Sequence, residues 1–311
     1  MAPGPSCCLY VYANPMSQNA KPNRSLVGDH RRQWRDFRYV YPVVSRRARG
    51  LSIGINLNPE KACNYSCVYC QVDHAVDRHL RGVDLEVLAN ELRLTLEEAI
   101  TGAIWNVKPF DATPPELRRV NDIAFSGDGE PTCLPTFDKA VALAADAKRQ
   151  LAAQAVKIVV ITNATQLESP QVQRALPILD ANNGEIWAKL DAGTEEYFRQ
   201  INRPAAGVTL EKVLGGIISV AQGRPIVIQT LFLRRGAAAP SPAEIGAYCS
   251  RLRDILQAGG KIKLAQIHTV ARPPQETDVC ALPNEDLDAI AATVRSTLPE
   301  LAVEVHYGLP K

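Results

Sequence analysis

The sequence predicts an α/β fold in which parallel strands are joined by helices, as a barrel or an open sheet. Two observations support this. Short apolar segments typical of strands alternate six times with longer segments of helical periodicity, which implies parallel strands joined by right-handed crossovers. Polar residues directly follow several of these strands, and the ligands of such folds bind at the carboxyl ends of the strands.

The first predicted strand and helix flank a cysteine-rich loop. Residues 51–57 alternate apolar with small or polar residues, which predicts a strand, and Asn58-Pro59 forms its exit turn. Apolar residues at helical spacing then predict a helix over 84–100 with Asp84 as its N-cap. Residues 102–120 contain three prolines and are predicted to be a loop.

The later elements continue the alternation. Strands are predicted at 123–125, 156–161, 186–190, 226–232, 262–267 and 301–305. Helices are predicted at 134–151, 176–182, 195–201, 210–220, 242–256 and 284–296. The β-branched run at 156–161 is typical of a buried parallel strand.

Composition narrows the class of protein. A chain of 311 residues with 46% hydrophobic and 22% charged residues fits a globular protein of one large domain or two small ones. A net charge of +2 does not by itself imply a nucleic-acid partner. Eight cysteines are too few and too unevenly placed for a secreted disulfide framework. With neither a signal peptide nor an apolar run near the ~20 residues of a membrane span, we expect a cytoplasmic protein that does not bind membranes.

Residues 1–45 are predicted to form an N-terminal arm, partly disordered or packed on the main domain at 46–311. Arginines and aromatic residues interleave between residues 24 and 49. This composition occurs on RNA-contacting surfaces. The alternative is a solvated arm whose aromatic side chains pack on the main domain, and we favour that alternative.

A cluster of three cysteines is the clearest chemical signal. Cys63, Cys67 and Cys70 are separated by three and then two residues, and Tyr69 precedes the third. Soft thiolates at this spacing suit iron or zinc. Structural zinc needs four protein ligands, and His74 is the nearest candidate for a fourth. Three thiolates on a four-iron cluster leave one iron open for a substrate or cofactor.

The Cys-x3-Cys-x-aromatic-Cys pattern resembles the radical S-adenosylmethionine (SAM) superfamily. The resemblance implies a partial (β/α)6 TIM-like barrel with a C-terminal helix and strand. It also implies a [4Fe-4S] cluster on Cys63, Cys67 and Cys70, with SAM bound to its open iron and Tyr69 beside the adenine. Reductive cleavage of SAM would give a 5′-deoxyadenosyl radical that abstracts hydrogen from the substrate.

Two strand-end motifs agree with the resemblance. Gly127, Asp128, Gly129 and Glu130 follow the strand at 123–125. Glycines let the backbone approach a ligand closely, and a carboxylate can receive an ammonium group. The segment resembles the family's Gly-Gly-Glu element, which holds the SAM amino group, although Asp128 replaces the first glycine; the alternative is an ordinary turn. Asn163 lies in Thr-Asn-Ala, which resembles the family's Thr-Asn-Gly near the cofactor.

Polar residues on three later strands are further candidates for the site. Lys189 and Asp191 are two residues apart and share one side of a strand, where a buried charged pair is costly without partners. We expect both to contact SAM or substrate, the alternative being an internal salt bridge. Gln229 and His268 complete the predicted SAM contacts, and Cys133, His268 and Lys189 are the catalytic candidates.

Several segments together resemble a group of small stand-alone radical SAM proteins described as related to wyosine synthases, which remodel a modified guanine in tRNA. These segments are Asn56-Leu-Asn-Pro59, Gly129-Glu-Pro-Thr132, Lys189-Leu-Asp-Ala192, Asn202-Arg-Pro204 and Gln266 through Pro274. Archaeal wyosine synthases carry extra upstream cysteines for a second cluster, whereas this chain has no cysteine between Cys8 and Cys63.

Three functional hypotheses remain open from the sequence. The first is an iron–sulfur oxidoreductase of the radical SAM type that acts on a small molecule or peptide, with a flavodoxin or ferredoxin as one-electron donor. The second is the same chemistry on tRNA, as in wyosine synthesis. The third is a metal-binding protein without enzymatic activity.

Overall fold

The computed structural model describes residues 34–45, 47–72 and 82–308 of the chain. Most of the predicted N-terminal arm, Cys7, Cys8 and His74 lie outside the described residues.

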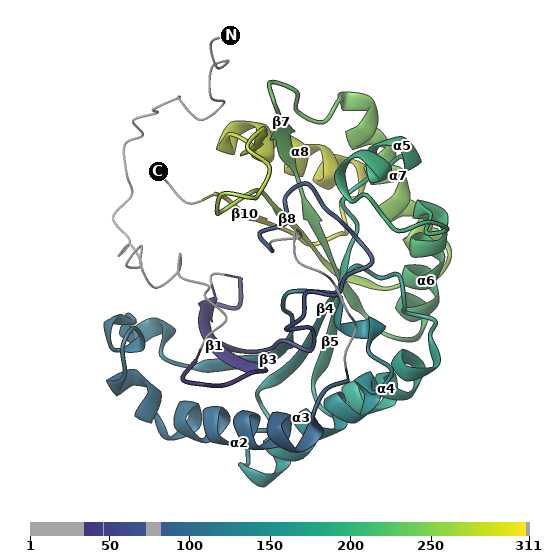
Figure 1. Cartoon of the computed structure of the whole chain (residues 1–311). Coiled ribbons are helices and arrows are strands. Elements are labelled where there is room, and N and C mark those ends of the chain that lie inside the picture. The colour runs from purple at the N-terminus through teal and green to yellow at the C-terminus, as the bar shows by residue number, and fades with distance from the viewer. Residues whose placement is uncertain (1–33, 46, 73–81, 309–311) are drawn as a thin grey trace.

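Within the described residues, a single curled sheet of eight strands forms the centre of the molecule (Figure 1). Its order is β1-β2-β3-β4-β5-β6-β8-β10. The strands are β1 (Val40–Ser45), β2 (Gly50–Ile55), β3 (Val120–Phe125), β4 (Lys157–Thr162), β5 (Gly184–Lys189), β6 (Ile226–Leu231), β8 (Ile262–His268) and β10 (Val303–His306). Strand β1 pairs antiparallel with β2, and all other neighbours in this sheet pair in parallel.

Helices cover the outer, convex face of the sheet, so that the strands form a half-barrel inside an open arc of helices (Figure 1). The helices are α2 (Leu85–Thr101), α3 (Phe137–Gln150), α4 (Pro170–Ala181), α5 (Glu195–Ile201), α6 (Leu210–Gly223), α7 (Pro242–Gln257) and α8 (Asn284–Thr297). Short 3-10 helices lie at Ala103–Asn106, Phe110–Ala112, Pro115–Leu117 and Pro131–Cys133. The predicted partial barrel of the TIM type is confirmed.

Local sequence explains where these elements begin and end. The Asp84 carboxylate accepts hydrogen bonds from the amides of Glu86 and Val87, which confirms it as the N-cap of α2. Thr194 and Thr209 cap α5 and α6 in the same way. Helix α4 begins earlier than predicted because Pro170 occupies its first turn, where a missing amide hydrogen costs nothing.

The sequence indicates a short strand or arm at Val43-Val44, whereas the small second sheet was not predicted. Residues 40–45 of the predicted arm form the antiparallel edge strand β1, with Pro42 at an edge position that tolerates proline. A separate two-stranded sheet pairs β7 (Leu233–Arg235) with β9 (Val279–Ala281).

The interior of the half-barrel is layered. An apolar layer is formed by Ala124, Val159, Trp187 and Val227, with Ile161 and Leu264 packed against it. The next interior row towards the carboxyl ends of the strands is polar. In that row Lys189 is the register partner of Gln229, and Gln229 is the partner of Gln266. The barrel therefore has an apolar floor beneath a polar row, because alternate residues of each strand share one face.

In the described part of the chain, every helix is too short or too polar to cross a bilayer.

Candidate active site in the barrel cavity

The cysteine loop connects β2 to α2 and is fastened to the segment that follows α5. The amide of Ser66 donates to the backbone oxygens of Asn202 and Arg203, both at 3.1 Å, and the amide of Val68 donates to the oxygen of Ile201 at 2.9 Å. A further bridge joins Tyr65 to Pro204. The Asn202-Arg203-Pro204 segment thus holds the cysteine loop at the carboxyl end of the barrel.

A buried polar network joins this loop to β5. The Tyr69 hydroxyl donates to the Asp191 carboxylate, which also accepts from the Asn202 side chain at 2.8 Å and the Leu231 amide at 2.9 Å. The Asn202 amide group lies 3.5 Å from the Cys67 sulfur. Burial and the Asp191 charge hold the pKa of Tyr69 well above its usual value, so the hydroxyl stays protonated and donates.

The loop after β3 packs tightly against the cysteine loop. A Cβ at Gly129 would lie 1.9 Å from the backbone oxygen of Ala62, and a Cβ at Gly127 would lie 2.3 Å from the Asn56 side-chain oxygen. The Asn56 amide group donates to the Asp128 carboxylate at 2.7 Å, and its oxygen accepts from the Asp128 amide at 3.1 Å. Both glycines are therefore required for close approach between these two loops.

Glu130 joins the ends of β3 and β4. Its buried carboxylate accepts from the hydroxyls of Thr132 and Thr162 at 2.5 and 2.6 Å, and from the amide of Asn163 at 2.7 Å. Burial raises its pKa, and these hydrogen bonds counter the rise. The Asn163 side chain donates to the Asn64 side-chain oxygen at 2.7 Å. Both side chains therefore already form hydrogen bonds within the protein. Their contacts with SAM remain a prediction.

A cavity of about 300 Å³ lies inside the half-barrel, between these loops and the apolar floor. Every strand of the main sheet contributes to its wall, together with Cys70–Val72 of the cysteine loop. Five residues predicted from the sequence line it: Tyr69, Cys70, Lys189, Gln229 and His268. The other predicted site residues are not among the lining residues: Cys63, Cys67, Gly127, Asp128, Gly129, Glu130, Asn163, Asp191 and Cys133.

The polar side chains of the cavity differ in whether they have hydrogen-bond or ion-pair partners. The Lys189 ammonium lies 5.4 Å from the centre of the Tyr69 ring, and the described residues provide no acidic partner for it within ion-pair distance. The internal salt bridge considered for Lys189 and Asp191 is therefore not formed among them. Gln229 donates to Gln266 at 2.8 Å, while its own side-chain oxygen is buried without a partner.

His268 is a neutral imidazole in this cavity. Burial lowers its pKa well below the ordinary value, and the positive charges of Arg47 and Lys189 lower it further. Its Nδ1 is buried without a hydrogen-bond partner. An imidazole with so low a pKa is a weak base near neutral pH, which favours hydrogen bonding over proton abstraction as its role.

The cysteine side chains have the donor chemistry that an iron–sulfur cluster needs. Among the described residues, no three histidine, cysteine or acidic side chains are placed so that they could hold a metal ion together. The three thiols nevertheless share one short loop, and the Cys63 sulfur accepts from the Tyr65 amide at 3.5 Å. Burial raises the pKa of Cys63 to about 12 and that of Cys67 to about 11. Metal binding must therefore displace their protons. Three thiolates with N–H donors near the sulfurs fit a four-iron cluster.

The cavity also contains a buried carboxyl group that sequence reasoning missed. Asp122 on β3 is 4% exposed and accepts a hydrogen bond from the Ser52 hydroxyl. Burial raises its pKa from 3.8 to about 6, despite the Ser52 hydrogen bond and the charges of Lys157 and Arg47. An acidic residue directly before the apolar run at 123–125 was the available signal, since a buried acidic group needs partners. The predicted strand began one residue after it.

We expect Asp122→Asn to stabilise the protein at neutral pH. The raised pKa means that ionised Asp122 opposes folding above about pH 6 and has no such effect below its unfolded pKa of 3.8. At 1.36 kcal/mol per pKa unit, the gain above pH 6 is about 3 kcal/mol. Urea unfolding at about pH 3.5 and about pH 7 measures this. Asp111→Asn at an exposed aspartate is the control, and equal shifts at both pH values would contradict the expectation.

Cys133 lies outside the cavity. Burial raises its pKa to about 12, and the neighbouring Glu130 charge acts in the same direction. Cys133 therefore lies apart from Lys189 and His268, the other two catalytic candidates, which both line the cavity.

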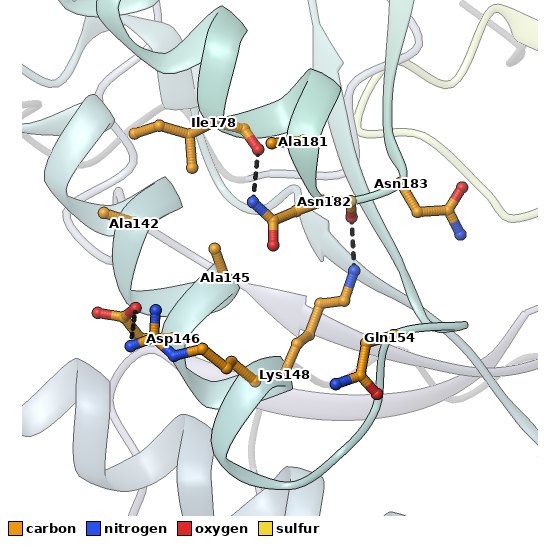
Figure 2. A pocket seen from close by; sticks show the side chains of 10 residues that line it. Ala142, Ala145, Asp146, Lys148, Gln154, Ile178, Ala181, Asn182 and Asn183 are labelled. Atoms are coloured by element: carbon orange, nitrogen blue, oxygen red, sulfur yellow. Dashed lines mark hydrogen bonds and ion pairs between the residues drawn. The ribbon is translucent and has the colours of Figure 1, made fainter.

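A second hollow of about 540 Å³ lies between α3 and α4 on the outside of the barrel (Figure 2). There the Lys148 ammonium donates to the Asn182 backbone oxygen at 2.5 Å. This contact satisfies a carbonyl at the end of α4, and no residue predicted for the site lines the hollow.

The basic stretch at 24–49 is described only from residue 34. Trp34, Tyr39 and Tyr41 are buried, and Arg35 and Arg38 form ion pairs with Glu98 and Glu60. In the described part, the aromatic side chains therefore pack on the main domain, as favoured from the sequence.

No family model matches the chain, but several proteins are similar to it in sequence, of which two are described here. A UPF0026 protein of Methanocaldococcus jannaschii is 30% identical over 178 residues, which cover 57% of this chain and 48% of that protein. A UPF0026 protein of Synechocystis is 30% identical over 201 residues, which cover 64% of this chain and 66% of that protein. The matched part thus spans about half to two thirds of these relatives.

Solved structures share the fold at low sequence identity. A radical SAM methyltransferase from Sphaerobacter thermophilus gives a TM-score of 0.57 at 13% identity, covering 86% of this chain and 69% of that one. SuiB of Streptococcus suis bound to S-adenosylmethionine gives 0.52 at 12%, covering 84% and 52%. TYW1 with a lysine–pyruvate adduct gives 0.53 at 12%, covering 88% and 80%.

Proposed function

Since this chain has the fold of the radical SAM enzymes, we propose that it is itself a radical SAM enzyme that acts on a small-molecule or peptide substrate. The observation that carries the proposal is the position of the three-cysteine loop. It lies at the carboxyl end of a half-barrel, and Cys70 faces the interior cavity. Ligand sites of such folds lie at this end.

Cys63, Cys67 and Cys70 would hold the cluster. A [4Fe-4S] cluster with SAM would supply a 5′-deoxyadenosyl radical that takes a hydrogen atom from the substrate. The Tyr69–Asp191–Asn202 network fixes the loop, and Asn202 also places an N–H donor near the Cys67 sulfur. Hydrogen bonds to cluster sulfurs tune the reduction potential.

The chain's own residues otherwise orient ligands and exclude water. The backbone of Gly127 and Gly129 packs against the cysteine loop, which fixes the strand-end loop for which the SAM contacts are predicted. Tyr69 presents a ring at the cavity wall beside which adenine could stack. We further propose a cytoplasmic, reducing location and a flavodoxin- or ferredoxin-type electron donor, because such clusters are oxygen-sensitive and need one electron per cleavage.

Anaerobic reconstitution with iron and sulfide tests the proposal. We expect about four iron and four sulfide per chain, and 5′-deoxyadenosine after addition of SAM and dithionite. Binding of zinc alone, without sulfide or SAM cleavage, would support the non-enzymatic metal-binding alternative and contradict the proposal.

A further inference from the structure

The interior polar row Lys189–Gln229–Gln266 lies deeper in the barrel than the strand-end loops. Gln229 is within β6, two residues before its end, and the row is directly above the apolar layer that contains Trp187 and Val227. By contrast, Gly127–Glu130 and Asn163 follow the ends of β3 and β4. Two of its members, Lys189 and Gln229, line the cavity and would contact a ligand bound at its bottom.

This row offers both a cation and an unused acceptor. The Lys189 ammonium has no acidic partner within ion-pair distance among the described residues, and the side-chain oxygen of fully buried Gln229 accepts no hydrogen bond. Lys189 and Gln229 are register partners on adjacent strands. One further residue on the same wall, His268, has an unpartnered Nδ1. Buried polar atoms are rarely left without a partner unless a ligand or water supplies one.

The charge of the whole cavity has the same sign as Lys189. Among the described lining residues, three carry permanent positive charges, namely Arg47, Lys189 and Arg272, and one carboxyl group is present, Asp122. The Ser52 hydroxyl donates to that carboxyl group. A buried cation between low-dielectric walls attracts anions. Lys189 is the cation on which the assignment rests, because Arg47 and Arg272 have other interactions.

We propose that Lys189 and Gln229 bind the substrate of this enzyme, and that the substrate is a small organic anion carrying a hydroxyl or amino group. The anionic group of the substrate, a carboxylate or phosphate ester, pairs with the Lys189 ammonium. The hydroxyl or amino group of the same molecule donates a hydrogen bond to the Gln229 side-chain oxygen. This assignment rests on the proposed radical SAM function, and the expectation that Lys189 and Gln229 contact SAM is the alternative that the experiment below tests.

Calorimetric titration of the reconstituted, SAM-loaded protein tests the assignment with four probes: L-malate, succinate, glycerol 3-phosphate and total tRNA. We expect L-malate or glycerol 3-phosphate to bind, and succinate, which lacks the hydroxyl, to bind more weakly than L-malate. Lys189→Met should weaken anion binding about tenfold or more, since a charge-assisted hydrogen bond is lost. Lys189→Arg should retain most of the affinity, and Lys212→Met on the surface should change nothing.

Separate titration with SAM, and 5′-deoxyadenosine formation without substrate, distinguish this inference from the function on which it rests. Lys189→Met should weaken anion binding far more than it weakens SAM binding. Loss of SAM binding in Lys189→Met would assign the row to SAM and overturn the inference. The inference would also be overturned if only tRNA bound, if none of the anions bound, or if the substitution left anion binding unchanged. Failure of the wild-type protein to cleave SAM would instead contradict the proposed function.

Discussion

Replacing Cys67 with alanine is expected to abolish both the iron–sulfur cluster and SAM cleavage. With only Cys63 and Cys70 left, the loop provides two thiolates, and a four-iron cluster would have two irons without protein ligands. The Cys67 sulfur also receives the Asn202 side-chain amide at 3.5 Å, so its loss removes a contact between the loop and the segment after α5. Iron and sulfide content, visible absorbance and 5′-deoxyadenosine yield measure the effect.

Cys249→Ala is the matched control for Cys67→Ala. Cys249 is a buried cysteine on α7, away from the cysteine loop. Its replacement should lower stability slightly through lost packing and leave cluster content and SAM cleavage intact. Undiminished SAM cleavage by Cys67→Ala would show that the three-cysteine loop is not the cluster site.

Gly129→Ala is expected to have the largest effect of any single methyl group added to this fold. The new Cβ would lie 1.9 Å from the Ala62 backbone oxygen, a separation that requires backbone movement. Overpacking of this kind costs about 3 kcal/mol. Because Ala62 directly precedes Cys63, the movement should also displace the first cluster ligand. We expect a lower urea midpoint and reduced iron content after reconstitution.

Gly215→Ala separates this steric effect from the general effect of replacing glycine. Gly215 lies in α6 with no atom within 4 Å of the added Cβ, so alanine should stabilise the helix by about 0.5–1 kcal/mol. The two variants should therefore change the free energy of unfolding in opposite directions. Stabilisation, or full cluster content, in Gly129→Ala would mean that the two loops are not held at this separation.

Sequence reasoning located the parallel strands well because each is a short, dense apolar run. The predicted strand at 156–161 corresponds to β4 at Lys157–Thr162, and the helix predicted over 84–100 corresponds to α2 at Leu85–Thr101. The sheet edge was harder to predict, since an edge strand such as β1 accepts proline and has a weaker apolar pattern. The β7–β9 pair has three residues in each strand, too few for a periodic signal.

The candidate site was predictable as a set of residue types but not as a set of contacts. Lys189, Gln229 and His268 do line one cavity, because residues at the carboxyl ends of parallel strands gather at one end of the barrel. The partners of Asp191 and Glu130 could not be read from spacing. Asn202 reaches Asp191 only because two distant segments pack together, and the Glu130 carboxylate is engaged by residues 132, 162 and 163.

The order of strands along the main sheet is the order in which they are synthesised. The sheet can therefore grow from one edge as the nascent chain leaves the ribosome. The three thiols emerge more than a hundred residues before Asp191 and Asn202, whose side chains fasten their loop. Until translation has passed α5, the loop lacks these two side chains and has only its contacts with the loops after β3 and β4, so stable insertion of a metal centre is expected only after that point.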